Sequence, residues 1–175
     1  MVEVICDTSF LIHLATRRIK NIDNLHLIPA AQTRDKDDIT AEQMQEFCDQ
    51  VKSEYDYIFI DSPAGIEQGF RNALFAADKA IVVTTPEVAA IRDADRVIGF
   101  IEAHGKPKPE VILNRVRPKM VKQGDMMNTD DILGLLSVEL LGVIPEDENI
   151  VISTNRGVPI VHNKKSKSAE SFRRI

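Results

Sequence analysis

The residues best suited to chemistry lie in Tyr57–Glu67, which reads Y-I-F-I-D-S-P-A-G-I-E. An apolar run that ends in Asp61 is typical of a strand that presents a carboxylate where parallel strands end, and such sheets bind ligands at that edge. We interpret Asp61 as an acid that holds Mg²⁺ through water, with Gly65 offering its backbone N–H to a terminal phosphate. The alternative is an aspartate that caps the turn before the next helix.

The residues after Asp61 favour the first interpretation. Pro63 fixes its own φ and Gly65 leaves φ free, so a stiff hinge is followed by a flexible joint. An acid of this kind normally works with a Gly-rich phosphate loop and its lysine on an earlier strand. No G-x-x-x-x-G-K-[ST] occurs in the 175 residues. The sequence therefore predicts half of a nucleotide site.

Two other predicted strands end in residues that could contact a base. Asn114 follows Val111–Leu113 and could bind a purine edge through its side-chain amide, although Asn in this position is also a common turn former. The run from Pro145 to Asp147 follows Leu140–Ile144 and could cover the other side of a base, or form a turn. The residues alone leave both alternatives open.

Charged residues are concentrated at the start of a long predicted helix that runs from Pro86 to about His104. These residues are Glu87, Arg92, Asp93, Asp95 and Arg96. Mixed charge on a helix usually marks a solvated, salt-bridged face. The functional alternative is a surface on which a partner docks.

A further acid, Asp7, ends the first predicted strand and precedes a predicted helix. Either Asp7 or Thr8 is expected as the N-cap of that helix. The alternative interpretation is that Asp7 is the first metal-binding acid of a nuclease.

The elements that must position these residues alternate along the chain. The predicted strands are Val2–Cys6, Leu25–Ile28, Tyr57–Ile60, Ala80–Val83, Val111–Leu113 and Leu140–Ile144. The predicted helices are Ser9–Arg18, Thr40–Ser53, Gly69–Ala77, Pro86–His104, Thr129–Leu136, Glu148–Thr154 and one that begins near Ser166. Thr40 and Thr129 are the expected N-caps of their helices, and Val116–Asn128 is expected to be a connection. The continuous apolar run Tyr57–Ile60 predicts a strand covered on both faces. This alternation predicts an α/β fold with a doubly wound, mainly parallel sheet.

Length and composition exclude several classes of protein. A chain of 175 residues with 43% hydrophobic and 28% charged residues predicts one globular domain. A net charge of −5 gives no reason to expect nucleic-acid binding. Cys6 and Cys48 lie far apart without a His/Cys cluster, so no disulfide framework or zinc site is expected. No signal peptide and no apolar run of roughly 20 residues is visible, so a cytoplasmic location is expected.

From about residue 24 to residue 175, the chain resembles the MinD family, the ParA-type ATPases of bacteria and archaea that position the division site. Several long runs carry this resemblance. They are L-H-L-I-P-A-A-Q-T-R-D-K-D (Leu25–Asp37), Y-D-Y-I-F-I-D-S-P-A-G-I-E-Q-G-F (Tyr55–Phe70), I-V-V-T-T-P-E-V-A-A-I-R-D-A-D-R (Ile81–Arg96), V-I-L-N-R-V-R-P (Val111–Pro118) and L-G-V-I-P-E-D (Leu141–Asp147). The resemblance implies a P-loop NTPase-like fold that is incomplete at its N-terminal edge.

The resemblance also implies cofactors, partners and site residues. The cofactors would be ATP and Mg²⁺, with Asp61 as the catalytic Walker-B acid that holds Mg²⁺ through water. The second switch would be formed by Ser62, Pro63, Ala64 and Gly65, and Asn114 and Pro145 would flank the adenine. A surface near Glu87, Arg92, Asp93 and Asp95 would meet a second subunit, MinC and MinE. In this family ATP drives dimerisation, and a C-terminal amphipathic helix then binds the membrane.

The chain departs from the family pattern at both ends. Residues 1–22 stand where the phosphate loop is expected, and they resemble the start of a PIN domain, a metal-dependent ribonuclease fold. We therefore predict a PIN-like segment over residues 1–23 and a truncated MinD-like ATPase domain over residues 24–175, without the membrane helix. Three functions are expected from these features. The first is a division-site-positioning scaffold with weak or defective ATP hydrolysis, the second is a nucleotide-independent binding module for MinC-type partners, and the third is a PIN-type ribonuclease that uses Asp7.

Overall fold

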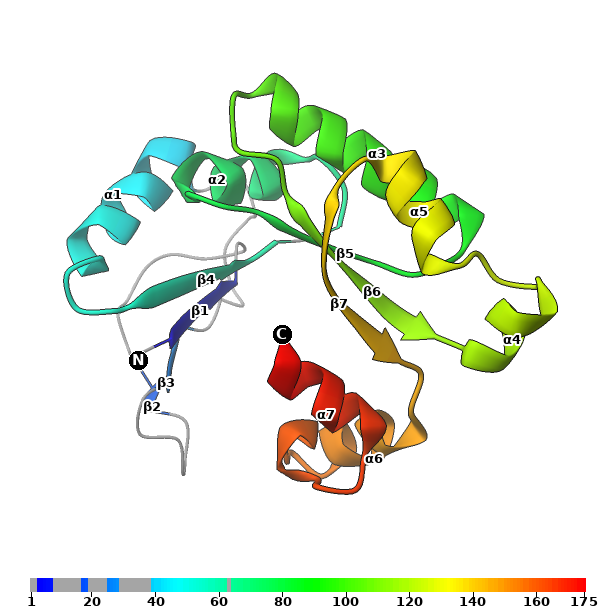
Figure 1. Ribbon diagram of the computed structural model, residues 1–175. Helices are drawn as coiled ribbons and strands as arrows, with labels where there is room; N and C mark the ends of the chain where they lie inside the picture. The colour runs from blue at the N-terminus through cyan, green and yellow to red at the C-terminus, as the bar shows by residue number, and fades with distance from the viewer. Residues whose placement is uncertain (1–2, 8–16, 19–24, 29–38, 63) are drawn as a thin grey trace. The chain divides into compact units, whose positions relative to one another are not determined.

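The computed structural model describes residues 3–7, 17–18, 25–28, 39–62 and 64–175. The chain forms two compact units, residues 1–78 (unit 1) and residues 79–175 (unit 2), and each is described by itself. In both units parallel strands are packed against helices, so the predicted α/β fold is confirmed (Figure 1).

Unit 1 contains a four-stranded sheet in the order β2-β3-β1-β4. Its strands are β1 (Glu3–Asp7), β2 (Arg17–Arg18), β3 (Leu25–Ile28) and β4 (Tyr57–Asp61). Strand β1 lies between β3 and β4 and is parallel to both, whereas β2 is antiparallel to β3. The prediction of a helix over Ser9–Arg18 is wrong for its last two residues, because Arg17 and Arg18 form the strand β2, which pairs with β3. Residues 9–16 lie outside the described residues.

Helices α1 (Ala41–Val51) and α2 (Gln68–Ala76) pack against each other in unit 1. Thr40 caps α1 as predicted: its hydroxyl accepts from Gln43 N at 3.3 Å, and its own N–H donates to Gln43 Oε1 at 3.0 Å. This capping box satisfies two backbone donors that a helix start otherwise leaves unpaired. Met44, Phe47 and Cys48 follow at helical spacing and are buried together with Ile39.

Strand β4 is covered on one face. Ile58 and Ile60 pack against the α1 core, whereas Tyr57 is 51% exposed and Phe59 is 40% exposed. Their two rings stack with centroids 6.4 Å apart. The prediction of a strand covered on both faces is therefore wrong for β4. Side chains alternate across a strand, and α1 meets only the face that carries Ile58 and Ile60.

Unit 2 contains three parallel strands in the order β5-β6-β7. These strands are β5 (Ile81–Thr84), β6 (Glu110–Val116) and β7 (Glu139–Pro145), and the helices are α3 (Val88–Ala103), α4 (Pro118–Gln123), α5 (Thr129–Leu136), α6 (Glu148–Asn155), the 3₁₀ turn η1 (Ile160–His162) and α7 (Lys167–Arg174). Helix α3 packs against β5 and α5, and α7 packs against β7 (Figure 1). The core residues Val111 and Ile132 have no exposed surface.

Three local expectations for unit 2 need correction. Helix α3 begins at Val88 with Glu87 as its N-cap, two residues after Pro86. Helix α5 is capped by Asn128, whose Oδ1 accepts from Asp131 N at 2.8 Å, and not by Thr129. The expected connection contains α4, because a proline at its first position is already fixed near helical φ. Among the described residues, none of the helices is long and apolar enough to cross a membrane.

Candidate functional site

The predicted magnesium acid lies at the end of a strand in unit 1. Asp61 is the last residue of β4, and Asp61, Ser62, Ala64 and Gly65 are all exposed. Gly65 has a φ of +96°, and no atom lies within 4 Å of the position that a Cβ would take. Glycine is therefore needed here for its backbone conformation and not for lack of space. Pro63 lies outside the described residues.

The sheet places a second aspartate beside Asp61. In the parallel pairing of β1 with β4, Cys6 is opposite Ile60 and Asp7 is opposite Asp61. Neighbouring strands lie about 4.8 Å apart, so two residues with formally negative side chains occupy adjacent strand ends. The strand beside β4 thus ends in an acid where a phosphate loop was expected.

The nuclease interpretation requires further acids or histidines near Asp7. Over residues 3–7, 17–18, 25–28, 39–62 and 64–175, no group of three or more His, Cys, Asp or Glu residues could hold a metal ion. The role of Asp7 as a metal ligand stays a prediction, and so does its role as a helix cap, since Thr8 lies outside those ranges.

A buried asparagine anchors the helix that follows the Gly65 joint. Asn72 is fully buried; its Nδ2 donates to Ile39 O at 2.6 Å, and its Oδ1 accepts from Gln68 Nε2 at 2.7 Å. Arg71 Nε donates to Ile66 O at 3.2 Å. This network was not predicted from the sequence, where its only signal is a polar residue on the apolar face of a helix.

The two residues expected to flank a base lie on neighbouring strands of unit 2. The register of β6 and β7 is irregular between Leu113 and Val116, and Val116 pairs with Pro145. Within this bulge Arg115 has a φ of +56°, and its N–H donates to Asn114 Oδ1 at 2.9 Å. A left-handed residue that is not glycine is uncommon and is often found at functional positions. The purine-edge role of Asn114 stays a prediction.

Two arginines from the end of β6 meet one carboxylate from the end of β7. Arg117 binds Glu146 with both Nε and Nη2, the latter at 3.0 Å, and Arg115 Nη2 lies 3.3 Å from the same carboxylate. The hydrogen bond from Arg117 lowers the pKa of Glu146, and Glu146 in turn raises the pKa of Arg117. Glu146 N also donates to Val116 O at 2.9 Å, which holds the strand ends together.

The next residue, Asp147, joins the first turns of two helices. Its Oδ2 accepts from Ser166 Oγ at 2.6 Å, and its Oδ1 accepts from Asn149 N at 2.9 Å. The Ser166 hydroxyl is the main cause that lowers the pKa of Asp147 to about 2. Ser166 caps α7, and Ser168 Oγ donates to Pro145 O at 2.9 Å. Helix α7 therefore fixes the end of β7.

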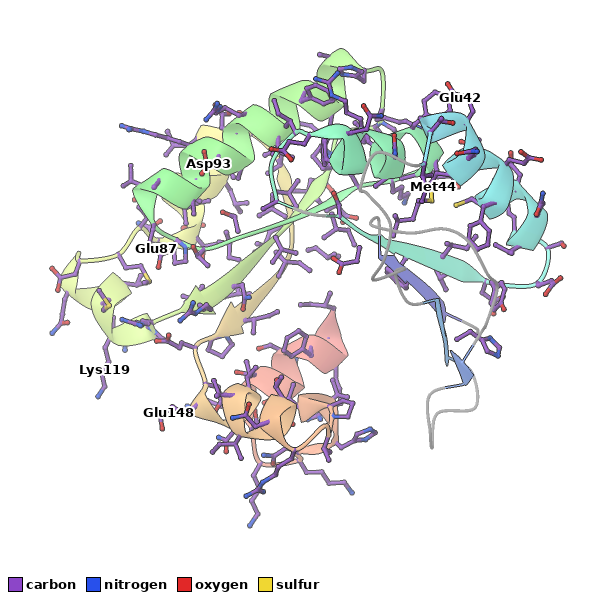
Figure 2. The ribbon with its side chains drawn as sticks, turned by 180° about the vertical axis from the view of Figure 1, so that it is seen from behind. Glu42, Met44, Glu87, Asp93, Lys119 and Glu148 are labelled. Carbon is purple, nitrogen blue, oxygen red and sulfur yellow. The ribbon has the colours of Figure 1, made fainter. Side chains whose placement is uncertain are left out.

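A groove of about 570 Å³ lies between the start of α3 and the segment that contains α4. Its apolar lining is Val88, Met120, Val121, Met126 and Met127, and its charged lining is Glu87, Asp125, Asp131 and Arg117. Figure 2 shows Glu87 at the start of α3 and Lys119 on the neighbouring α4. The structure thus brings one predicted partner residue, Glu87, into a concave site.

The other predicted partner residues lie along α3. Arg92, Asp93 and Asp95 are exposed, whereas Ile91 and Ala94 between them are buried. Figure 2 shows Asp93 on α3. Its carboxylate pairs with Arg96 at 3.4 Å, as expected of a solvated face. The docking role of these three residues stays a prediction.

Comparisons with known proteins show which family the chain resembles. The family model described as an AAA domain matches residues 3–111, which include β1, and the predicted boundary after residue 23 stays a prediction. The septum site-determining protein MinD of Synechocystis is 56% identical over 146 residues, which are 83% of this chain and 55% of that protein. MinD of Bacillus subtilis is 44% identical over 165 residues, 93% of this chain and 62% of that protein. The chain thus spans little more than half the length of these relatives.

Solved structures extend the comparison to the fold. The MinD cell division protein of Aquifex aeolicus is 34% identical with a TM-score of 0.87, over 98% of this chain and 80% of that chain. The MinC:MinD complex from the same organism gives 35% identity and a TM-score of 0.88 over the same shares of the two chains. MinD of Pyrococcus horikoshii, complexed with Mg-ADP, is 25% identical with a TM-score of 0.81, also over 98% of this chain and 80% of that chain. The chain belongs to the MinD family.

Proposed function

We propose that this chain is a MinD-type septum site-determining scaffold that docks a MinC-type partner and hydrolyses ATP weakly or not at all. The names of its relatives support the division role, and the solved MinC:MinD complex supports the partner. A cytoplasmic, membrane-peripheral location, contacts with MinE and formation of a homodimer are expected from the resemblance to the MinD family.

The observation that carries the proposal for ATP is the register of Asp7 with Asp61. Phosphoryl transfer depends on positioning the phosphates and neutralising their charge. Two acidic residues, Asp7 and Asp61, end the adjacent strands β1 and β4. The 175 residues contain no lysine-bearing phosphate loop that would supply the opposite charge. We therefore assign no catalytic step to Asp61 in this chain.

An ATPase assay on the purified 175-residue chain with Mg²⁺ tests this part. We expect turnover that does not change when Asp61 is replaced in Asp61→Ala. The exposed acid of α5 in unit 2, changed in Asp130→Ala, is the matched control. Turnover at the level of a full-length MinD that disappears in Asp61→Ala but not in Asp130→Ala would overturn the proposal.

The groove beside α3 supports docking without nucleotide. Methionines adapt to irregular apolar surfaces, and three of them line this groove. The three acids among its lining residues outnumber the single arginine, so the groove fits a partner segment that combines apolar and basic side chains. The exposed charges at Arg92, Asp93 and Asp95 would extend this surface along α3.

Affinity for purified MinC, measured with and without ATP, tests the docking part. We expect equal affinity in both conditions, and a loss of at least about tenfold in Met126→Glu because a charge would enter the apolar lining. The exposed Lys164→Glu in unit 2 is the control and should bind normally. Binding that requires ATP would contradict nucleotide-independent docking.

The nuclease alternative has its own test. Manganese-dependent RNA cleavage that is abolished by Asp7→Asn would favour a nuclease over the scaffold.

A further inference from the structure

We propose that the Arg117–Glu146 ion pair positions α4 and thereby sets the shape of the methionine-lined groove. The pair would control docking without being the main contact of the partner. This consequence for docking rests on the proposed function, whereas the positioning of α4 does not depend on it.

Arg117 connects the end of β7 to two of the groove methionines. Its guanidinium binds Glu146 through two nitrogens, its backbone N–H lies 3.4 Å from Met126 Sδ, and its Nη1 lies 3.7 Å from Met120 Sδ. Met120 belongs to α4, and Met126 follows that helix. One residue therefore joins the strand end to both sides of the segment that forms the groove.

Helix α4 is short and has no fully buried residue. It is six residues long, none of its residues is buried, and it ends at Gly124 with a φ of +81°. A helix this short is not stable by itself, and burial of an apolar face normally supplies what propensity does not. The half-buried Met120 and Val121 supply only part of the packing that a longer helix would have. We therefore infer that the contacts of Arg117 help to fix where α4 lies.

Glu146, the other member of the ion pair, lies on a segment whose backbone is held in place by hydrogen bonds. Glu146 N donates to Val116 O, Pro145 O accepts from Ser168, and Asp147 accepts from Ser166. Glu146 thus projects from a strand end that several hydrogen bonds hold in place. Exposed ion pairs usually contribute little, but a bidentate arginine within a network is the recognised exception.

Methionine methyl groups offer a direct readout of this positioning. The chain has five methionines, and ¹³C-methyl labelling would report Met120 and Met126 separately from Met44 in the core of unit 1. We expect the Met120 and Met126 signals to shift in Arg117→Glu and in Glu146→Arg, and to return towards their wild-type positions in the double variant. The Met44 signal should stay unchanged in all three.

Two further variants keep the test decisive. Glu146→Gln retains the size of the side chain and removes its charge, so it should shift the same two signals even if the charge reversals fold poorly. Exchange of the exposed pair Lys108–Glu102, which lies 3.8 Å apart in unit 2, is the matched control and should leave Met120 and Met126 unchanged. Unchanged signals in Glu146→Gln, or no recovery in the double variant, would overturn the positioning role.

Affinity for purified MinC provides the second readout. Each single reversal should weaken binding about five- to tenfold, and the double variant should recover most of that loss, as interacting residues do in a double-mutant cycle. If the wild-type chain fails to bind MinC while the methionine signals behave as expected, the docking function is wrong and the positioning role stands. If MinC binds every variant equally while the signals shift, the pair does not control docking and that part of the inference is wrong.

Discussion

The ends of the parallel strands differ between the two units. In unit 1, Asp61 and Gly65 are exposed, and the neighbouring strand β1 adds a second acid. In unit 2, residues at and just after the ends of β6 and β7 are joined to each other and to α7 by hydrogen bonds that include the Arg117–Glu146 pair. The strand end that carries the family's D-S-P-A-G motif is therefore the exposed one, whereas the strand ends of unit 2 are held by a network of hydrogen bonds.

The largest expected effect on stability tests whether the two units unfold independently. Met44→Ala in unit 1 and Ile132→Ala in unit 2 each leave a cavity at a fully buried site, which costs about 2–5 kcal/mol of stability. We expect each variant to lose hydrogen-exchange protection mainly in its own unit. Equal loss in both units would show that the chain unfolds as one body, and the two sites would then share one source of stability.

A smaller effect is expected from the buried network of unit 1. Asn72→Ala removes both hydrogen bonds of the Asn72 side chain, so Ile39 O and the Gln68 amide lose their partner. This loss costs about 1–3 kcal/mol of stability. Urea unfolding should show the loss, and hydrogen exchange should place it in α2. The control is Asn155→Ala at the exposed end of α6, which should change stability by less than about 0.5 kcal/mol. An equal loss in both variants would mean that Asn72 does not anchor α2.

The smallest expected effect is confined to acid conditions and to unit 2. The pKa of Asp147 is about 2, below the ordinary value of 3.8, because Ser166 and Asn149 donate to its carboxylate. A carboxyl group of this kind stabilises the fold fully above pH 4 and loses that contribution as the pH falls through 2. Asp147→Asn should therefore be less stable than the wild type at pH 6, and the difference should shrink towards pH 2.

Thermal unfolding between pH 6 and pH 2 measures this difference, with Asp130→Asn on α5 as the control for a lost charge. A difference between wild type and Asp147→Asn that is constant over this range would contradict the assigned role of Asp147. A loss seen equally in Asp130→Asn would attribute the effect to net charge and not to the contact with Ser166.

The sequence by itself determined the local features of this protein. The strand Leu25–Ile28 and the end of β4 at Asp61 were predicted from apolar runs, and the cap at Thr40 from residue type. The D-S-P-A-G run predicted a flexible joint at Gly65, and its φ of +96° lies in the region that favours glycine. These features depend on steric and hydrogen-bonding preferences over a few residues, which a short stretch of sequence carries in full.

Only the tertiary structure decided which of these residues meet. The register of β1 puts Asp7 opposite Asp61, 54 positions further along the chain, and the β6–β7 bulge puts Arg117 against Glu146. Cover on both faces of β4 was predicted from the sequence, but only one face is covered. An apolar run does not indicate which face of the strand a helix will pack against. Strand order, register and helix placement are set by packing between distant segments, and no local preference encodes them.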